Sequence, residues 1–268
     1  MWELEKKFKK LKEFASKFER VVLAFSGGVD SATLAALCKY ETEVLAVTFK
    51  TQVTPSRELN QALKLAKEIG LKHEVIELDI LSPEFRRNPF ERCYLCKKKM
   101  IEELLKIAER RGCDAVFEGT NYSDLEEYRP GYKAIKEFEK VYSPWVEFGF
   151  SKDEIRRIAE KLNLSVANSP SLSCLATRIP FGIEITEEVL KMIDEAENFV
   201  IDLCKVENVR VRNVNSLAII EVPKGLEEKV FEKREKIVEK FKEIGFEAIF
   251  LDLEGYKSGK ATLWNFLK

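Results

Sequence analysis

The sequence predicts an α/β fold in which a parallel, doubly wound sheet is followed by a smaller α+β C-terminal domain. Short apolar runs, typical of strands buried on both faces, alternate with helical stretches as far as residue 162. Strands that alternate with helices of this length imply right-handed crossovers and helices on both faces of the sheet. Beyond Thr186 this alternation ends. The length of 268 residues accommodates one large domain or two modest ones.

The elements of the first domain, residues 1–167, are expected in a regular order. Residues 2–17 carry apolar side chains at spacings of three and four, the period of an amphipathic helix. Thr54 and Gly70 are placed to cap and to end a helix between them, and Ser151 with Glu154 forms a capping box. We expect strands at residues 21–25, 44–49, 74–78, 115–118 and 141–142, and further helices at residues 31–40, 55–69, 96–110 and 155–162.

The second part of the chain has a different pattern. Residues 168–185 contain two prolines and little periodicity, so they are expected to form a loop between the domains, and loops of this length are often functional. The order that follows predicts a small α+β domain at residues 186–268. Its expected elements are a helix at 187–204, strands at 209–214 and 217–222, a helix at 226–244 and a strand at 248–253.

Composition and charge argue against several classes of protein. Lys and Arg (45) nearly balance Asp and Glu (46), so a net charge of −1 does not describe a general polyanion binder. No apolar run is long enough to span a bilayer, and the first ten residues are too charged for a signal peptide. Six cysteines are too few for a disulfide framework. We therefore expect a folded cytoplasmic protein with no nucleic-acid or membrane partner.

A glycine-containing loop lies between the first predicted strand and its helix. Backbone N–H groups at a helix N-terminus point toward an anion, and paired glycines allow the backbone to approach it closely. The loop lacks the lysine of a Walker A motif and the third glycine of a dinucleotide fingerprint. A glycine turn that only connects strand and helix is the alternative. We predict a phosphate and Mg²⁺ site formed by Ser26, Gly27, Gly28, Val29, Asp30 and Ser31.

A second polar loop follows the strand predicted at residues 115–118. The carboxyl ends of neighbouring parallel strands face one crevice, so this loop is expected beside the glycine loop. Asp124 is placed to share Mg²⁺ with Asp30, and Arg129 to neutralise a leaving pyrophosphate. On its own this motif is equally typical of a turn. The candidate residues are Gly119, Thr120, Asn121, Asp124 and Arg129.

The cysteines divide into two groups. Cys93 and Cys96 form a CxxC pair before a predicted helix, and Cys174 lies in the expected interdomain loop. A CxxC pair alone is compatible with half of a zinc site, a redox pair or part of an iron–sulfur site. His73 is the single histidine, but it is expected on the surface of a strand. The remaining cysteines are expected to be small buried hydrophobic residues: Cys38, Cys113 and Cys204.

Longer motifs make the comparison with known families specific. The SGGVDS loop resembles the PP-loop of ATP pyrophosphatases, which hold the β and γ phosphates of ATP. Over about the whole chain the sequence resembles the LarE family, through PSLSCLATRIPFGIEIT at 170–186, EGTNYSDLEEYRPG at 118–131, VRVR at 209–212 and LDLEGYKSG at 251–259. The resemblance implies the adenine-nucleotide alpha hydrolase fold and an ATP-dependent sulfur transferase that acts on a pyridinium biscarboxylic acid mononucleotide, a small-molecule nucleotide substrate. A homo-oligomer is also expected.

The resemblance also implies roles for individual residues. ATP adenylates a substrate carboxylate, pyrophosphate leaves, and sulfur delivered from the Cys174 position displaces AMP; the catalytic residues implied are Cys174, Asp30 and Arg178. Arg178, Arg210 and Arg212 are candidates for the substrate's phosphate and carboxylates because a guanidinium grips both in bidentate fashion. The alternative for Arg210 and Arg212 is a solvated strand face.

The pair Cys93 and Cys96 resembles the branch of the family in which three cysteines, with Cys174, hold a [4Fe-4S] cluster. Sacrifice of the Cys174 sulfur itself and a zinc site remain alternatives. Lys97 and its two neighbouring lysines are expected to be a solvated first turn of helix. Two other functions also remain open: a tRNA thiolase, for which neither a broad basic surface nor terminal zinc ribbons is visible, and a non-catalytic nucleotide sensor.

Overall fold

The computed structural model describes residues 2–126, 130–170 and 173–257, and it divides the chain into two compact units. The first unit consists of Met1–Thr51, Arg57–Ile80 and Glu91–Leu172. The second consists of Gln52–Ser56, Leu81–Phe90 and Ser173–Lys268. Among the described residues, no helix has both the length and the apolar character that crossing a membrane requires.

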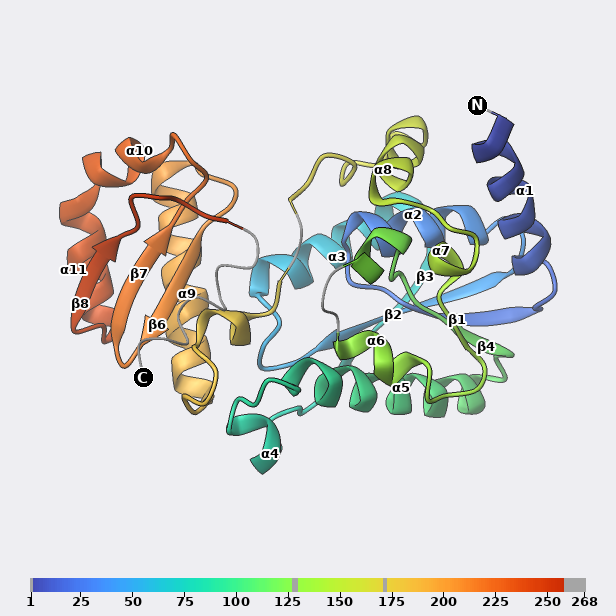
Figure 1. The fold of residues 1–268 in the computed structure, drawn as a ribbon, viewed down its shortest axis with the longest axis horizontal. Helices are drawn as coiled ribbons and strands as arrows, with labels where there is room; N and C mark the ends of the chain where they lie inside the picture. Colours follow the sequence, from blue (N-terminus) through green and yellow to red (C-terminus); the bar gives the residue numbers. More distant parts are fainter. Residues whose placement is uncertain (1, 127–129, 171–172, 258–268) are drawn as a thin grey trace. The chain divides into compact units, whose positions relative to one another are not determined.

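The first unit contains the predicted parallel sheet (Figure 1). Its strands are β1 (Arg20–Ala24), β2 (Glu43–Lys50), β3 (Lys72–Glu77), β4 (Ala115–Phe117) and β5 (Val141–Tyr142). Their order is β3-β2-β1-β4-β5, and every neighbouring pair is parallel. The chain runs outward from β1 to β3 and then returns to β4 on the other side of β1. The order therefore reverses between β1 and β4, the position at which open α/β sheets bind ligands.

Burial on both faces explains why β1 is apolar after its first residue, Arg20. Val21 and Leu23 belong to one hydrophobic core, whereas Val22 between them belongs to another, as the period of two in a strand requires. Helices α1 (Trp2–Ala15), α2 (Val29–Cys38), α3 (Ser56–Ile69) and α8 (Lys152–Lys161) contribute to the first core. Helix α5 (Arg92–Arg111) contributes Leu104 and Ile107 to the second. In Figure 1, α5 accordingly lies on the opposite face of the sheet from α2 and α8.

Helix α5 begins four residues earlier than the sequence predicted. Its first residue is Arg92, so Cys93 and Cys96 lie on the helix and not before it. The N-cap is Glu91, whose side chain makes no capping hydrogen bond. Because no Ser, Thr, Asp or Asn occupies the cap, the sequence carries no signal for this start. The predicted capping box of α8 is present in full: Ser151 accepts from the Glu154 N–H, and the Glu154 side chain accepts from the Ser151 N–H.

Short helices complete the first unit. They are the 3₁₀ turn η1 (Tyr122–Glu126) and helices α6 (Pro130–Ile135) and α7 (Pro144–Glu147). The aromatic ring of Phe14, near the end of α1, packs on those of Phe117, Tyr142 and Phe148 with centroids 5.3–5.7 Å apart. Through these contacts the N-terminal helix closes the core over β4 and β5, as its amphipathic pattern predicts.

The second unit is a three-stranded sheet with its own helices and core (Figure 1). Strands β6 (Arg210–Val214) and β7 (Leu217–Glu221) form a hairpin, and β8 (Ala248–Leu251) pairs with β7 in parallel. Positive φ angles at Asn215 and Ser216 fit the turns that hairpins favour. Helix α9 (Glu187–Cys204) is as predicted, but the helix expected at 226–244 is divided into α10 (Glu227–Glu232) and α11 (Arg234–Ile244).

Two short segments from the N-terminal half of the chain belong to the second unit. Val53, just after β2, accepts a hydrogen bond from the Leu175 N–H at 2.8 Å. After β3 and the short helix α4 (Pro83–Arg86), Asn88 accepts from the Gly182 N–H at 2.9 Å, and its buried side-chain amide donates to the Pro180 carbonyl at 2.8 Å. Residues 173–185 are thus held by the segments that follow β2 and β3.

Candidate functional site

The glycine loop connects β1 to the N-terminus of α2. Gly28 is the N-cap of α2 and has no side chain, so the first N–H groups of the helix have no side-chain cap. The hydroxyls of Ser26 and Ser31 lie 3.1 Å apart, and Ser31 Oγ accepts from the Ser26 N–H at 3.2 Å. These bonds fold the loop over the helix end, where the macrodipole and the N–H groups favour an anion.

Helix α3 supports the loop from outside and explains the need for glycine at position 27. Gly27 has φ +74°, and a Cβ added there would lie 2.7 Å from Ala62 Cα. The Gln61 side-chain amide donates to the Gly27 carbonyl at 2.8 Å, which fixes the orientation of that peptide. Both the positive φ and the contact with a backbone atom therefore exclude a side chain at this position.

The loop that follows β4 lies directly against the N-terminus of α2, as the sheet order predicts. A Cβ added to Gly119 would be only 3.1 Å from the Ser31 backbone nitrogen. Asn121 donates to Asp30 Oδ1 at 3.4 Å, and its own N–H donates to Asp124 Oδ2 at 3.2 Å. The structure thus brings Gly119, Asn121 and Asp124 together with the glycine loop. Arg129 lies outside the described residues.

Asp30 is a partly buried carboxylate of this region whose surroundings shift its pKa. Its side chain forms an ion pair with Lys152, the first residue of α8, and its carbonyl accepts from Trp145 Nε1 at 3.0 Å. Burial raises the pKa of Asp30 above its ordinary value, and the negative charge of Asp124 adds to this, while the positive charge of Lys152 opposes it. A group of this kind is suited to binding a cation.

Lys152 belongs to the candidate site through its ion pair with Asp30, and sequence reasoning missed it. The capping box explained its neighbours, Ser151 and Glu154, and no role was given to the lysine between them. A signal was nevertheless present, because a positive charge in the first turn of a helix opposes the macrodipole. The structure shows what compensates that cost, since the Lys152 ammonium reaches the buried Asp30 carboxylate.

Lys97 is also part of this region, and the expectation that it is a solvated lysine is wrong. Its Nζ donates at 3.0 Å to Glu118, the residue after β4, whose side chain is almost fully buried. The Glu118 carboxylate also accepts from the Thr120 N–H at 3.1 Å, from its hydroxyl at 2.7 Å and from the Ser143 hydroxyl. Burial acts to raise the pKa of Glu118, but the Lys97 charge and these hydrogen bonds outweigh it and lower that pKa.

The three candidate cysteine ligands belong to different units. Cys93 is exposed and Cys96 partly exposed on α5 of the first unit, and Cys174 is partly exposed in the second. Within the described part of the chain, no group of three or more His, Cys, Asp or Glu residues is placed to hold a metal ion. His73 is half-buried rather than on the surface, with Nε2 2.8 Å from Thr48 Oγ1.

In the second unit, Arg178 is an anchor of the loop that carries Cys174. Its side chain is 1% exposed and pairs through Nε and Nη2 with the Glu197 carboxylate at 2.8 and 3.0 Å. Nη1 donates to the carbonyls of Ser173 and Cys174, both at 2.9 Å. These contacts hold the backbone on either side of the Cys174 side chain, and the contact of Arg178 with a substrate stays a prediction.

Arg210 and Arg212 are buried on β6, so the alternative of a solvated strand face is wrong. Arg212 donates to the Thr177 carbonyl and to Glu221 Oε2, both at 2.7 Å. Arg212 Nε and Glu221 Oε1 are buried without a hydrogen-bond partner in the described part of the chain. The Arg210 guanidinium lies 5.3 Å from the ring centroid of Tyr256. Arg212 and Glu221 therefore retain capacity to bind a further polar group.

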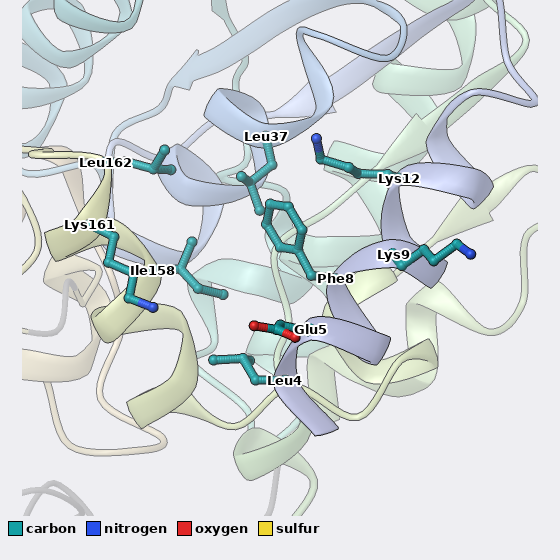
Figure 2. A pocket seen from close by; sticks show the side chains of 9 residues that line it. All are labelled: Leu4, Glu5, Phe8, Lys9, Lys12, Leu37, Ile158, Lys161 and Leu162. Atoms are coloured by element: carbon teal, nitrogen blue, oxygen red, sulfur yellow. The ribbon is translucent and has the colours of Figure 1, made fainter. Parts of the chain in front are cut away.

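A separate cavity of about 390 Å³ lies between α1, α2 and α8 (Figure 2). Apolar side chains, including Phe8, Leu37 and Ile158, form most of its wall, and lysines lie at its edge. None of the predicted site residues lines it, and no buried polar side chain does either. This cavity is therefore not the candidate site.

Comparison with known proteins extends over both units. The NAD synthase family model matches residues 3–114. An uncharacterized protein of Methanocaldococcus jannaschii is 40% identical over 242 residues, which are 90% of this chain and 92% of that protein. An uncharacterized protein of Synechocystis is 37% identical over 263 residues, 96% and 97% of the two chains. The pyridinium-3,5-bisthiocarboxylic acid mononucleotide synthase of Lactiplantibacillus plantarum is 30% identical over 246 residues, 90% and 88% of the two chains.

The contact between Gly27 and α3 predicts that two glycine-to-alanine variants differ in their free energy of unfolding. Gly70 has nearly the same φ as Gly27, +73°, but open space where a Cβ would lie. Gly70→Ala should therefore cost only the backbone strain, about 1–2 kcal/mol. Gly27→Ala should cost about 1–3 kcal/mol more, because the new methyl group overlaps Ala62. Urea unfolding measures both; equal losses would show that α3 does not constrain the loop.

The Arg178 contacts predict that the stability of the second unit depends strongly on this side chain. Arg178→Met should lower the free energy of unfolding by about 3–5 kcal/mol, because Glu197 then keeps a buried charge without its partner. Lys240→Met is the matched control, because Lys240 pairs at 2.7 Å with the exposed Glu195, which lies on α9 like Glu197. This substitution should lower the free energy of unfolding by less than about 1 kcal/mol. Similar losses in urea unfolding would contradict the anchoring role.

Proposed function

The chain belongs to the LarE family, that of the pyridinium-3,5-bisthiocarboxylic acid mononucleotide synthase, and we propose that it is an ATP-dependent sulfur transferase of the PP-loop type. Its substrate would be a pyridinium biscarboxylic acid mononucleotide, one carboxylate of which becomes a thiocarboxylate. The observation that carries the proposal is the convergence of the glycine loop, the loop after β4 and the charged pair Asp30–Lys152 at the N-terminus of α2. The first unit would bind ATP, and the second would bind the substrate.

In the first step, a substrate carboxylate oxygen attacks the α phosphorus of ATP, the α–β phosphoanhydride bond breaks, and pyrophosphate leaves. The N–H groups of the loop and the hydroxyls of Ser26 and Ser31 would hold the β and γ phosphates. Mg²⁺, when bound, neutralises charge on the phosphates, and the carboxylates of Asp30 and Asp124 fit it by charge and position. Lys152 would then exchange its bond with Asp30 for a phosphate oxygen.

In the second step, sulfur attacks the acyl carbon, a C–S bond forms, and the bond to the AMP oxygen breaks. Cys174 would act at this step, and Arg178 would hold its backbone in place. Arg210 and Arg212 would bind the phosphate or carboxylates of the substrate. The unused hydrogen-bonding capacity of Arg212 Nε supports this role, because buried donors in proteins are almost always paired.

We propose that Cys93, Cys96 and Cys174 together hold a [4Fe-4S] cluster. Three thiolates would leave one iron without a protein ligand, and that iron would supply a binding position for an exogenous sulfur atom. The exposure of Cys93 supports the proposal, since Cys38 and Cys204 are buried and burial raises the pKa of Cys38 to about 12. Cys113, which was expected to be buried, is partly exposed like Cys96 and Cys174, so exposure alone does not separate it from them.

The nucleotide assignment predicts that Asp30→Ala abolishes the formation of AMP and pyrophosphate, because Mg²⁺ loses a ligand and Lys152 its partner. The matched control is Asp153→Ala, which removes an exposed carboxylate next to Lys152 in the sequence and should retain the parent rate. Release of pyrophosphate in the presence of the biscarboxylic acid mononucleotide measures both. Parent-like turnover in the Asp30 variant would refute the assignment.

The cysteine assignment predicts about four irons per chain after anaerobic reconstitution. Replacing any one of Cys93, Cys96 and Cys174 by Ala should remove both the cluster and multiple-turnover sulfur transfer, whereas Cys113→Ala should retain both. Iron and sulfide analysis with thiocarboxylate formation measures this. If the double variant Cys93→Ala, Cys96→Ala still delivers one sulfur per chain and loses the mass of H₂S at Cys174, the sacrificial mechanism holds instead.

A further inference from the structure

An ion pair joins the helix that carries the two neighbouring cysteines to the sheet. Lys97 follows Cys96 on α5, and its ammonium lies 3.0 Å from Glu118 Oε2. The Glu118 side chain is 2% exposed and that of Lys97 is 31% exposed. Because the attraction between charges is stronger away from water, a half-buried pair of this kind restrains its helix more than a surface pair does.

The same carboxylate orders the nucleotide side of the region. Thr120 donates to Glu118 through both its N–H and its hydroxyl, at 3.1 and 2.7 Å. The residues on either side of Thr120 contact the glycine loop: Gly119 packs against Ser31, and Asn121 donates to Asp30. A continuous set of contacts therefore runs from Lys97 through Glu118 to the residues proposed to bind MgATP.

The start of α5 is held by one buried side chain, Arg92, and by the Lys97–Glu118 pair about one turn further along the helix. The Glu91 side chain does not cap the helix, and Cys93 is exposed in the first turn. Uncapped first turns open locally more often than helix interiors. The neighbouring side chains Tyr94 and Lys98 are bonded to Glu137, but that pair is exposed and contributes less. The reactivity of Cys93 and Cys96 should therefore depend on how firmly Glu118 holds Lys97.

We propose that Lys97 and Glu118 are positioning residues that couple nucleotide binding at the glycine loop to the reactivity of Cys93 and Cys96. The coupling rests on the proposed binding of ATP. Bound MgATP would order the Gly119–Thr120–Asn121 loop, Thr120 would hold the Glu118 carboxylate in place, and Glu118 would hold Lys97. Binding of MgATP would thereby stabilise the docked first turn of α5 relative to its open form. By linkage, docking of that turn would raise the affinity for MgATP by the same factor.

The test compares alkylation rates with and without MgATP. The full chain, freed of metal and with reduced thiols, is treated with iodoacetamide, and modification of Cys93 and Cys96 is followed by mass spectrometry. In the parent, saturating MgATP should slow alkylation by about five-fold or more. The double variant Lys97→Met, Glu118→Gln removes both charges, so that neither is left buried alone. It should still bind MgATP by calorimetry, but the slowing should fall below about two-fold.

Lys98→Met is the matched control, because it removes the adjacent positive charge, whose partner Glu137 is exposed. In this variant MgATP should slow alkylation by the same factor as in the parent. The coupling is overturned if the double variant is protected as well as the parent, or if alkylation of the parent is indifferent to MgATP although calorimetry shows binding. If the parent binds no MgATP, the proposed function fails, and the coupling fails with it. Calorimetry therefore separates the two failures.

Discussion

Contact of backbone with backbone around the N-terminus of α2 is the constraint on which the rest of the site depends. Gly27 leaves no room for a side chain against Ala62, and Gly119 leaves little against Ser31. The strand order, which reverses between β1 and β4, makes this double approach possible. As a result, two loops far apart in the sequence present their polar groups to the same helix end, where N–H groups and the helix dipole favour an anion.

Buried charges divide the region into a fixed part and a part that is open to a ligand. Glu118 accepts from Lys97, Thr120 and Ser143, so its negative charge is well compensated and its pKa is lowered. Burial, with a smaller contribution from the like charge of Asp124, raises the pKa of Asp30 although Lys152 opposes this. A charge that the fold stabilises incompletely gains most from an added cation. Asp30 is therefore suited to ligand binding, and Glu118 to holding the structure.

In the second unit, arginine side chains donate to backbone carbonyls that are not bonded within a helix or sheet. Between Ser173 and Ile185 the chain has only one short 3₁₀ turn, η2 (Leu175–Arg178), so several of its carbonyls accept hydrogen bonds from side chains. Arg178 supplies them at Ser173 and Cys174, and Arg212 at Thr177. Each arginine is in turn held by a buried carboxylate, Glu197 or Glu221. The position of the Cys174 backbone thus depends on charges that cannot be removed singly without leaving the other unpaired.

The sequence alone determined the features that depend on local pattern: the parallel sheet, from the alternation of apolar strands and helices, the loop Ser26–Ser31, from its glycines, and the capping box of α8. Tertiary structure decided which charged residues take part. Lys152 lies 122 positions from Asp30, and Lys97 lies 21 positions from Glu118, so neither pair can be recognised from the local spacing of residues in the sequence. The same holds for the two segments from the N-terminal half that join the second unit through hydrogen bonds of Val53 and Asn88. Periodicity reports which face of an element is buried, whereas the partner of a buried charge is set by which elements the fold places side by side.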